Sequence, residues 1–190
     1  MRLPLEAEPA KALMLNLLTT LFREFLDICL FRKAPQDLPA SGSLLLVTLL
    51  ASATGSLILA RSSLPWPGAV QSALTETVFM AGAIYLILKL QDRTARWLQT
   101  LTAVAGTNAV LVIISLPLLL WLLSAQAGEM DATLPALLFL GLIIWNVMIL
   151  GHIFRHALST YFPLGVVVAL GYYSLSIMLL NWLAPAPVSG

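Results

Sequence analysis

The chain has 190 residues, of which 59% are hydrophobic and only 10% charged, and its formal net charge is +1. This composition excludes an ordinary soluble domain. The basic residues flank the apolar stretches instead of forming a patch, so we expect no nucleic-acid partner. The single cysteine, Cys29, excludes an internal disulfide. We interpret it as a small apolar packing residue, with a reactive or lipid-modified thiol as the alternative.

The N-terminal segment, residues 1–41, contains a stretch over 8–33 that is patterned as a helix. Polar side chains recur there every three or four residues and so share one stripe: Asn16, Thr20, Arg23 and Asp27. The charges make this stretch costly as a transmembrane span, so we predict an amphipathic helix lying in the membrane plane on the cytoplasmic face. It either anchors the bundle or presents a surface to a partner or to lipid. Pro35 and Pro39 then break the helix.

Five apolar stretches follow, each long enough to cross a bilayer core, which takes about 20 helical residues. They cover residues 42–60, 69–90, 101–123, 134–154 and 162–183. We therefore predict an all-α integral membrane protein, a bundle of five transmembrane helices over 42–183. We predict that residues 184–190 form a short external tail.

Basic residues are distributed unevenly between the two sides of this arrangement. Nine of the ten Lys and Arg residues fall in segments on one side of the membrane, and Arg61 alone falls on the other. Because cytoplasmic segments carry the excess of Lys and Arg, we predict a cytoplasmic N-terminus and an external C-terminus. Six basic residues are candidates for contact with anionic lipid headgroups or a partner: Arg32, Lys33, Lys89, Arg93, Arg96 and Arg155.

Three polar side chains lie well inside predicted spans: Glu76, Asn108 and Asn146. A carboxylate in the bilayer costs several kcal/mol, so Glu76 should face the bundle interior, be protonated or pair with a neighbour. The candidate partners are Thr75, Thr77 and Arg61. The three residues either form a site for an ion, a proton or a lipid headgroup, or join helices through hydrogen bonds worth about 1 kcal/mol each.

His152 and His156 are four residues apart and share one helical face, a spacing that suits a metal ion. No third ligand lies near them in the sequence, and Arg155 between them indicates a basic membrane boundary instead. The chain has no HExxH, GxSxG or P-loop motif and no paired intramembrane aspartates. We therefore expect no metal site, no catalytic residues, no cofactor and no enzymatic activity.

Two segments resemble the Yip1 domain family. Residues 102–120, TAVAGTNAVLVIISLPLLL, are similar to its third span, with small residues first and a proline later. Residues 142–179 are similar to its fourth and fifth spans joined by a short basic loop, where His156 and Ser159 match bacterial members. The resemblance implies a non-enzymatic role in membrane organisation, which eukaryotic relatives exercise by binding small GTPases in vesicle traffic. The short loops resemble bacterial members, so we expect the bacterial inner membrane.

Three hypotheses about function remain open at this stage. The first is a scaffold or accessory factor in membrane organisation or complex assembly, with the bilayer and either another membrane protein or a second copy of the chain as partners. The alternative is a carrier or permeation subunit for a small or lipidic molecule, with Glu76, Asn108 and Asn146 along its path. The third is a subunit that is stable only inside a larger assembly.

Overall fold

The computed structural model describes residues 7–128 and 131–183, which form helices and connecting turns with no strand among them. The α-helices are α1 (Ala7–Cys29), α2 (Gly42–Arg61), α3 (Trp66–Lys89), α4 (Trp97–Ala127), α5 (Thr133–Ala157) and α6 (Phe162–Leu183). Two 3-10 turns, η1 (Pro35–Asp37) and η2 (Thr94–Arg96), precede α2 and α4. Residues 1–6, 129–130 and the expected tail 184–190 lie outside the described residues.

Five of the described helices, α2 to α6, are long and apolar enough to cross a membrane. The prediction of an all-α, multi-pass membrane protein with five spans is therefore confirmed. Their outward faces carry large apolar side chains, as lipid-facing surfaces do. Leu46, Val78, Leu140 and Met178, from four different helices, are each more than half exposed.

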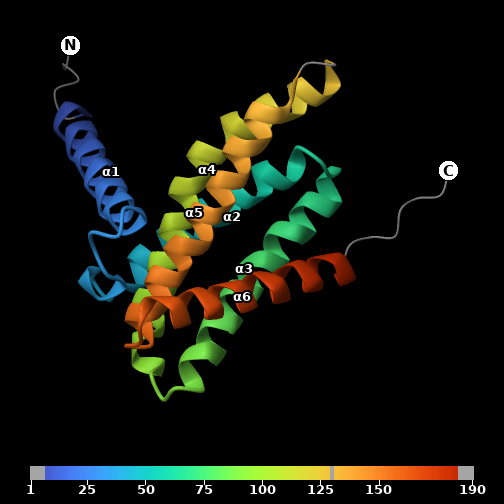
Figure 1. Cartoon of the computed structure of the whole chain (residues 1–190). Coiled ribbons are helices and arrows are strands. Elements are labelled where there is room, and N and C mark those ends of the chain that lie inside the picture. The colour runs from blue at the N-terminus through green and yellow to red at the C-terminus, as the bar shows by residue number, and fades with distance from the viewer. Residues whose placement is uncertain (1–6, 129–130, 184–190) are drawn as a thin grey trace, which may run out of the picture.

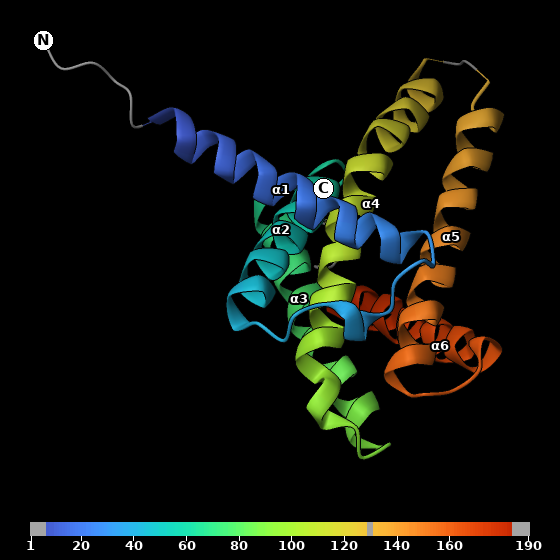
Figure 2. The same cartoon turned by 90° about the vertical axis from the view of Figure 1, so that its left-hand side faces the viewer.

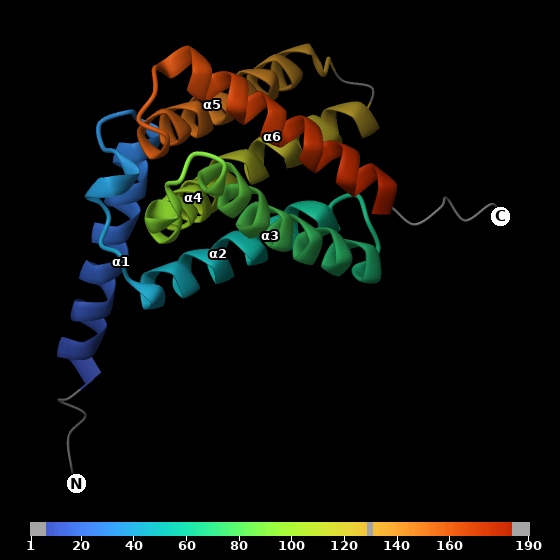
Figure 3. The ribbon, with the colours of Figure 1, turned by 90° about the horizontal axis from the view of Figure 1, so that it is seen from below.

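Helix α4 lies at the centre of the bundle, between the α2–α3 hairpin and the α5–α6 hairpin (Figures 1 and 3). It contacts α1, α2, α3 and α5, and residues 100–107 of α4 are all buried. Within the α5–α6 hairpin the two backbones touch. A Cβ atom added at Gly165 would overlap the Gly151 carbonyl oxygen, so the absence of a side chain at Gly165 permits this close approach.

Helix α1 crosses one side of the bundle, and its N-terminal half extends beyond the other helices (Figure 2). Its C-terminal turns pack against α4 and α5, where Phe25, Ile28 and Cys29 are buried. The Phe25 ring occupies the space that a side chain at Gly106 of α4 would need. The indole Nε1 of Trp145 in α5 donates a hydrogen bond of 3.1 Å to the Cys29 carbonyl oxygen. Helix α1 thus docks by one end; its placement in the membrane plane stays a prediction.

Candidate functional site

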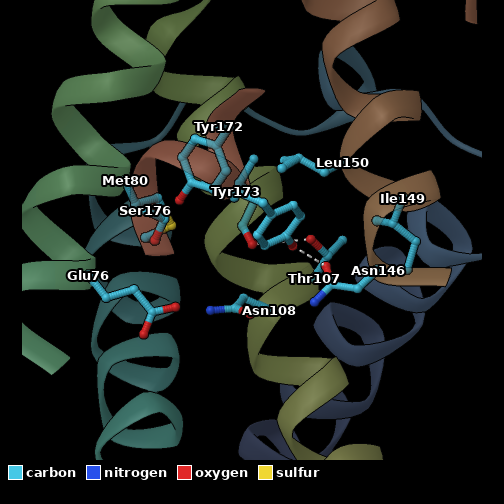
Figure 4. A pocket seen from close by; sticks show the side chains of 11 residues that line it. Glu76, Met80, Thr107, Asn108, Asn146, Ile149, Leu150, Tyr172, Tyr173 and Ser176 are labelled. Atoms are coloured by element: carbon cyan, nitrogen blue, oxygen red, sulfur yellow. Dashed lines mark hydrogen bonds between the residues drawn. The ribbon is translucent and has the colours of Figure 1, made fainter. Parts of the chain in front are cut away.

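The middle of the bundle holds a cavity of about 90 Å³ between α3, α4, α5 and α6 (Figure 4). That volume has room for a few water molecules or a small chemical group. Its polar lining consists of Glu76, Thr107, Asn108, Asn146, Tyr172, Tyr173 and Ser176. Its apolar lining consists of Met80, Val104, Ile149 and Leu150. A predominantly polar lining is unusual at this depth in a membrane protein, where polar groups are costly unless they have a partner.

The cavity brings together the three intramembrane polar residues that the sequence singled out. Glu76, Asn108 and Asn146 come from three different helices, and each lies near the middle of its own. The Glu76 carboxyl group and the Asn108 amide extend toward each other across the space (Figure 4). Each of the three side chains also has a polar neighbour on an adjacent helix.

The hydrogen bonds of these residues join helices in pairs. The Asn108 Nδ2 donates to Ser52 Oγ at 3.0 Å, which connects α4 to α2. The Tyr173 hydroxyl donates to Asn146 Oδ1 at 2.6 Å, which connects α6 to α5. The Glu76 carboxyl group lies beside the Ser56 hydroxyl of α2, within range of an interaction. The contacts expected of helix-joining residues are therefore present, and they surround a space instead of closing it.

Ser56 takes the place of the partners that the sequence suggested for Glu76. The Thr77 hydroxyl donates instead to the Ala73 carbonyl oxygen of its own helix at 2.8 Å. The Arg61 guanidinium donates to the Leu64 carbonyl oxygen at 3.0 Å and lies over the Trp66 ring. Thr77 and Arg61 are thus engaged away from the carboxylate, and Thr75 is not among the described residues that line the cavity.

Sequence reasoning missed the two tyrosines that form one wall of the cavity. The Tyr172 and Tyr173 rings lie 5.5 Å apart, centroid to centroid, at an interplanar angle of 79°. Tyr172 also packs against Phe79 of α3 at 5.3 Å and Phe154 of α5 at 6.3 Å, which fixes its ring. Tyrosine in membrane proteins concentrates at the interfaces, so a Tyr-Tyr pair in the middle of a span was the available signal.

A second hollow, of about 240 Å³, lies between α2, α4 and α5. We call it the apolar groove; its lining includes Leu59, Leu111, Val112, Leu119, Phe139, Leu142 and Ile143. Asn108 and Asn146 line both the apolar groove and the polar cavity. The two spaces are therefore neighbours, with these asparagines in the wall of each, so that a polar compartment lies beside an apolar one.

The predicted basic contact residues lie at one end of the bundle, which we call the basic end: the η1 segment with the α3–α4 and α5–α6 loops. Arg96 makes the most contacts, since its Nη1 donates to the His156 and Ala157 carbonyl oxygens and to Ser159 Oγ at 2.8 to 3.0 Å. Arg93 also donates to Ser159 Oγ, at 2.7 Å. The two arginines thereby join the α3–α4 loop to the α5–α6 loop.

The other four basic residues also have partners within the chain. The Lys33 ammonium group lies 2.6 Å from the Glu24 carboxylate, a hydrogen bond that raises the pKa of Lys33 above its usual value. Arg32 lies 3.7 Å from Asp27. Arg155 lies over the Phe162 ring and Lys89 near the Tyr85 ring. These contacts orient the side chains without excluding lipid or a partner from them.

The two histidines also help to hold the basic end together. His152 Nε2 lies 2.9 Å from the Lys33 carbonyl oxygen, and the His156 carbonyl oxygen accepts a hydrogen bond from Gln36 Nε2 at 2.7 Å. Gln99 Nε2 on α4 donates to the Leu38 carbonyl oxygen at 2.7 Å. Within the described ranges, no three His, Cys, Asp or Glu side chains gather as metal ligands would. His152 serves here to hold the segment that leads from α1 to α2.

Comparison with known proteins does not assign the chain to a family. No family model matches the chain, and no curated protein and no solved structure matches it significantly. The resemblance to the Yip1 domain family accordingly stays a prediction, and function has to be argued from the cavity, the groove and the basic end.

Proposed function

We propose that this protein is a carrier or permeation subunit of the membrane that binds a small amphiphilic molecule, with its polar group in the cavity and its apolar part in the apolar groove. The observation behind the proposal is the convergence of Glu76, Asn108 and Asn146 on one space. This function is the alternative that the sequence left open beside a scaffold. It is non-enzymatic and requires no cofactor.

Packing energetics favour a binding role for the cavity. Protein interiors are close-packed, and unfilled volume lowers stability. Helices that needed only hydrogen bonds to associate would gain nothing from leaving space among Glu76, Asn108 and the tyrosines. A carboxylate in the middle of a span is also costly, and the Ser56 hydroxyl alone is a weak partner for its charge. A ligand that fills the space and satisfies the carboxylate removes both costs.

The apolar groove supports an amphiphile in preference to a water-soluble solute. Apart from the two shared asparagines and Ser115, its lining side chains are apolar. Such a lining suits an alkyl chain, since ligand sites combine apolar walls with a few polar groups that fix orientation. Because Asn108 and Asn146 line both spaces, one molecule with a short polar head would occupy both if its chain passes between these two side chains.

The test is to identify what the protein retains when purified from native membranes in a mild non-ionic detergent. Organic extracts of the full chain are compared by mass spectrometry with those of Glu76→Gln and of Asp131→Asn. Asp131→Asn makes the same acid-to-amide change at an exposed loop residue. A near-stoichiometric amphiphile in the wild type and Asp131→Asn, lost from Glu76→Gln, supports the proposal. Identical extracts from all three proteins contradict it.

The proposal includes an orientation in the bacterial inner membrane, with the N-terminus in the cytoplasm and the C-terminus in the periplasm. Its support is the gathering of Arg32, Lys33, Arg93, Arg96 and Arg155 at the basic end, because cytoplasmic segments carry such an excess. Reporter fusions that are active on one side only, placed after residue 190 and in the 62–65 and 91–93 turns, test it. Activity of the periplasmic reporter in the 91–93 turn would reverse the orientation.

A second candidate, a scaffold or accessory factor, has support in a different part of the molecule. The N-terminal half of α1 extends beyond the bundle (Figure 2), and Asn16, Thr20 and Arg23 are exposed on α1. Such a helix is suited to contact another membrane protein or a second copy of the chain. A photo-crosslinking residue at Asn16, compared with one at lipid-facing Leu140, tests this. A discrete protein adduct at Asn16 that Arg23→Glu abolishes supports the scaffold; lipid adducts alone at both positions count against it.

A further inference from the structure

The lining of the polar cavity, among the described residues, contains an acidic side chain and no basic one, and this difference favours a cationic ligand over an anionic one. Glu76 is its one carboxylate, and none of the eleven described lining residues is Lys, Arg or His. An anionic group placed there would meet the Glu76 charge with no cation nearby. Beside an uncharged polar group, an ionised Glu76 would have no counter-ion in a medium where isolated charges are costly, whereas a cation allows Glu76 to stay ionised.

The tyrosine wall indicates which kind of cation fits. Aromatic faces attract cations within about 6 Å of the ring centroid, and aromatic groups beside a negative charge are a recurring site for substituted ammonium groups. Tyr172 and Tyr173 line the cavity with rings nearly at right angles, so they offer two differently oriented aromatic surfaces. Both rings lie on the same side of the space as Ser176, above Glu76 in Figure 4.

A bare metal ion matches this lining less well. Hard cations such as Ca²⁺ take six to eight oxygen ligands, usually with several carboxylates, and Mg²⁺ demands near-octahedral geometry. The cavity provides one carboxylate, and two of its polar groups, Asn146 Oδ1 and the Tyr173 hydroxyl, are already hydrogen-bonded to each other. A volume of about 90 Å³ is small, yet suits a methyl-substituted ammonium group better than a fused ring system.

We infer that the cavity binds the ammonium head of an amphiphilic organic cation. Glu76 is the counter-charge, Tyr172 and Tyr173 contact the substituents on nitrogen, and the alkyl part passes Asn108 and Asn146 into the apolar groove. This inference rests on the proposed function and specifies its substrate class. Glu76 and the tyrosines are binding residues here, and no chemical step is involved.

The experiment measures direct binding to the full chain in neutral maltoside micelles, which contain no choline lipid to compete. The probes are decyltrimethylammonium and decyl sulfate, which share an alkyl chain and differ in the sign of the head. The variants are Glu76→Gln, Glu76→Asp, Tyr172→Phe and Tyr172→Leu, with Asp131→Asn as the control. Elution as one species in size-exclusion chromatography establishes that each variant is folded.

The inference expects saturable binding of decyltrimethylammonium and none of decyl sulfate. Glu76→Gln and Tyr172→Leu should each weaken binding by about tenfold or more, because each removes one attraction for the cation. Tyr172→Phe keeps the ring and should bind within about threefold of the wild type, as should Asp131→Asn. Glu76→Asp keeps the charge and should bind better than Glu76→Gln.

The outcomes separate this inference from the proposed function. Equal binding of both probes, or binding unaffected by Glu76→Gln, would mean an amphiphile site without charge selectivity; the inference would then fail and the proposed function stand. Saturable binding of neither probe, together with no retained native amphiphile, would overturn both. If Glu76→Gln does not fold, the Tyr172→Phe and Tyr172→Leu pair decides the inference in its place.

Discussion

The middle of the bundle and its basic end use polar side chains in opposite ways. At the basic end, Arg96, Gln36 and Gln99 donate to backbone carbonyl oxygens and so close the loops onto one another. In the middle, Asn108 and Asn146 bond to side chains of neighbouring helices, Glu76 lies beside Ser56 of α2, and the three leave a cavity between them. Polar side chains that donate to the carbonyl oxygens of a loop hold that loop in place. Polar side chains gathered around a space can contact a ligand there.

The largest loss of stability is expected when a methyl group is added where the backbones of α5 and α6 touch, near the basic end. In Gly165→Ala the new methyl group meets the backbone of Gly151 and Arg155, which cannot move aside. We expect a loss of about 1–3 kcal/mol or more in unfolding free energy, as for overpacked sites. Gly171→Ala, on the same helix with nothing within 4 Å, is the matched control. Equal unfolding midpoints for the two variants would mean that α5 and α6 are not in such close contact.

The next largest loss of stability is expected on removal of the Arg96 side chain. Arg96→Ala leaves the His156 and Ala157 carbonyl oxygens without this donor. Because the site is only half-buried, water partly replaces the donor, and we expect a loss of about 1 kcal/mol. Unfolding in a denaturing detergent titration measures the loss. Lys89→Ala, an exposed cation at the same end, should change stability little. Comparable losses in both variants would show that the basic end is held by general charge effects and not by the Arg96 hydrogen bonds.

Alkaline pH tests the docking of α1 on the bundle. Burial raises the pKa of the Cys29 thiol to about 12, against 9.0 for the unperturbed group. Above pH 9 the unfolded chain ionises its thiol and the folded chain does not, so stability falls as pH rises from about 9 to 12. At pH 10 this contribution is about 1 kcal/mol.

The stability difference between the wild type and Cys29→Ala, measured at pH 8 and pH 10, isolates this contribution from other titrating groups. The advantage of the wild type should shrink at pH 10. Since Cys29 is the one cysteine in the sequence, maleimide labelling of the folded chain at pH 8 should be slow and become fast on unfolding. Rapid labelling of the folded chain would place α1 away from α4 and α5.

The smallest loss of stability is expected when a hydrogen bond between two cavity residues is removed. Tyr173→Phe removes the hydrogen bond to Asn146 and should lower the unfolding free energy by about 0.6 kcal/mol, the average for hydrogen bonds between membrane helices. The same detergent titration measures it. A loss as large as that of Arg96→Ala would mean that the cavity residues hold the bundle together, and the contrast between the two regions would disappear.

Span number was predictable from the sequence because a long apolar stretch has one stable form in a bilayer, the helix. Polar side chains in the middle of spans were also visible, since their cost makes each one conspicuous. Ser52, Ser56 and the two tyrosines were not singled out, because helical periodicity does not say which neighbour a face meets. Which groups converge depends on how α2, α4 and α6 rotate about their axes, and packing of all five spans together determines that rotation.

Gly106 gives the docking of α1 a consequence for the cavity. The Phe25 ring rests on Gly106, and the next two residues of α4, Thr107 and Asn108, line the cavity. One helical turn thus serves as the seat of α1 and as part of the cavity wall. Because linkage between two sites is reciprocal, a ligand that shifts this turn changes how firmly α1 is held, and tension on α1 changes the affinity for the ligand. The part of α1 that extends from the bundle would then be the place where a partner acts on the cavity, through the contact between Phe25 and Gly106.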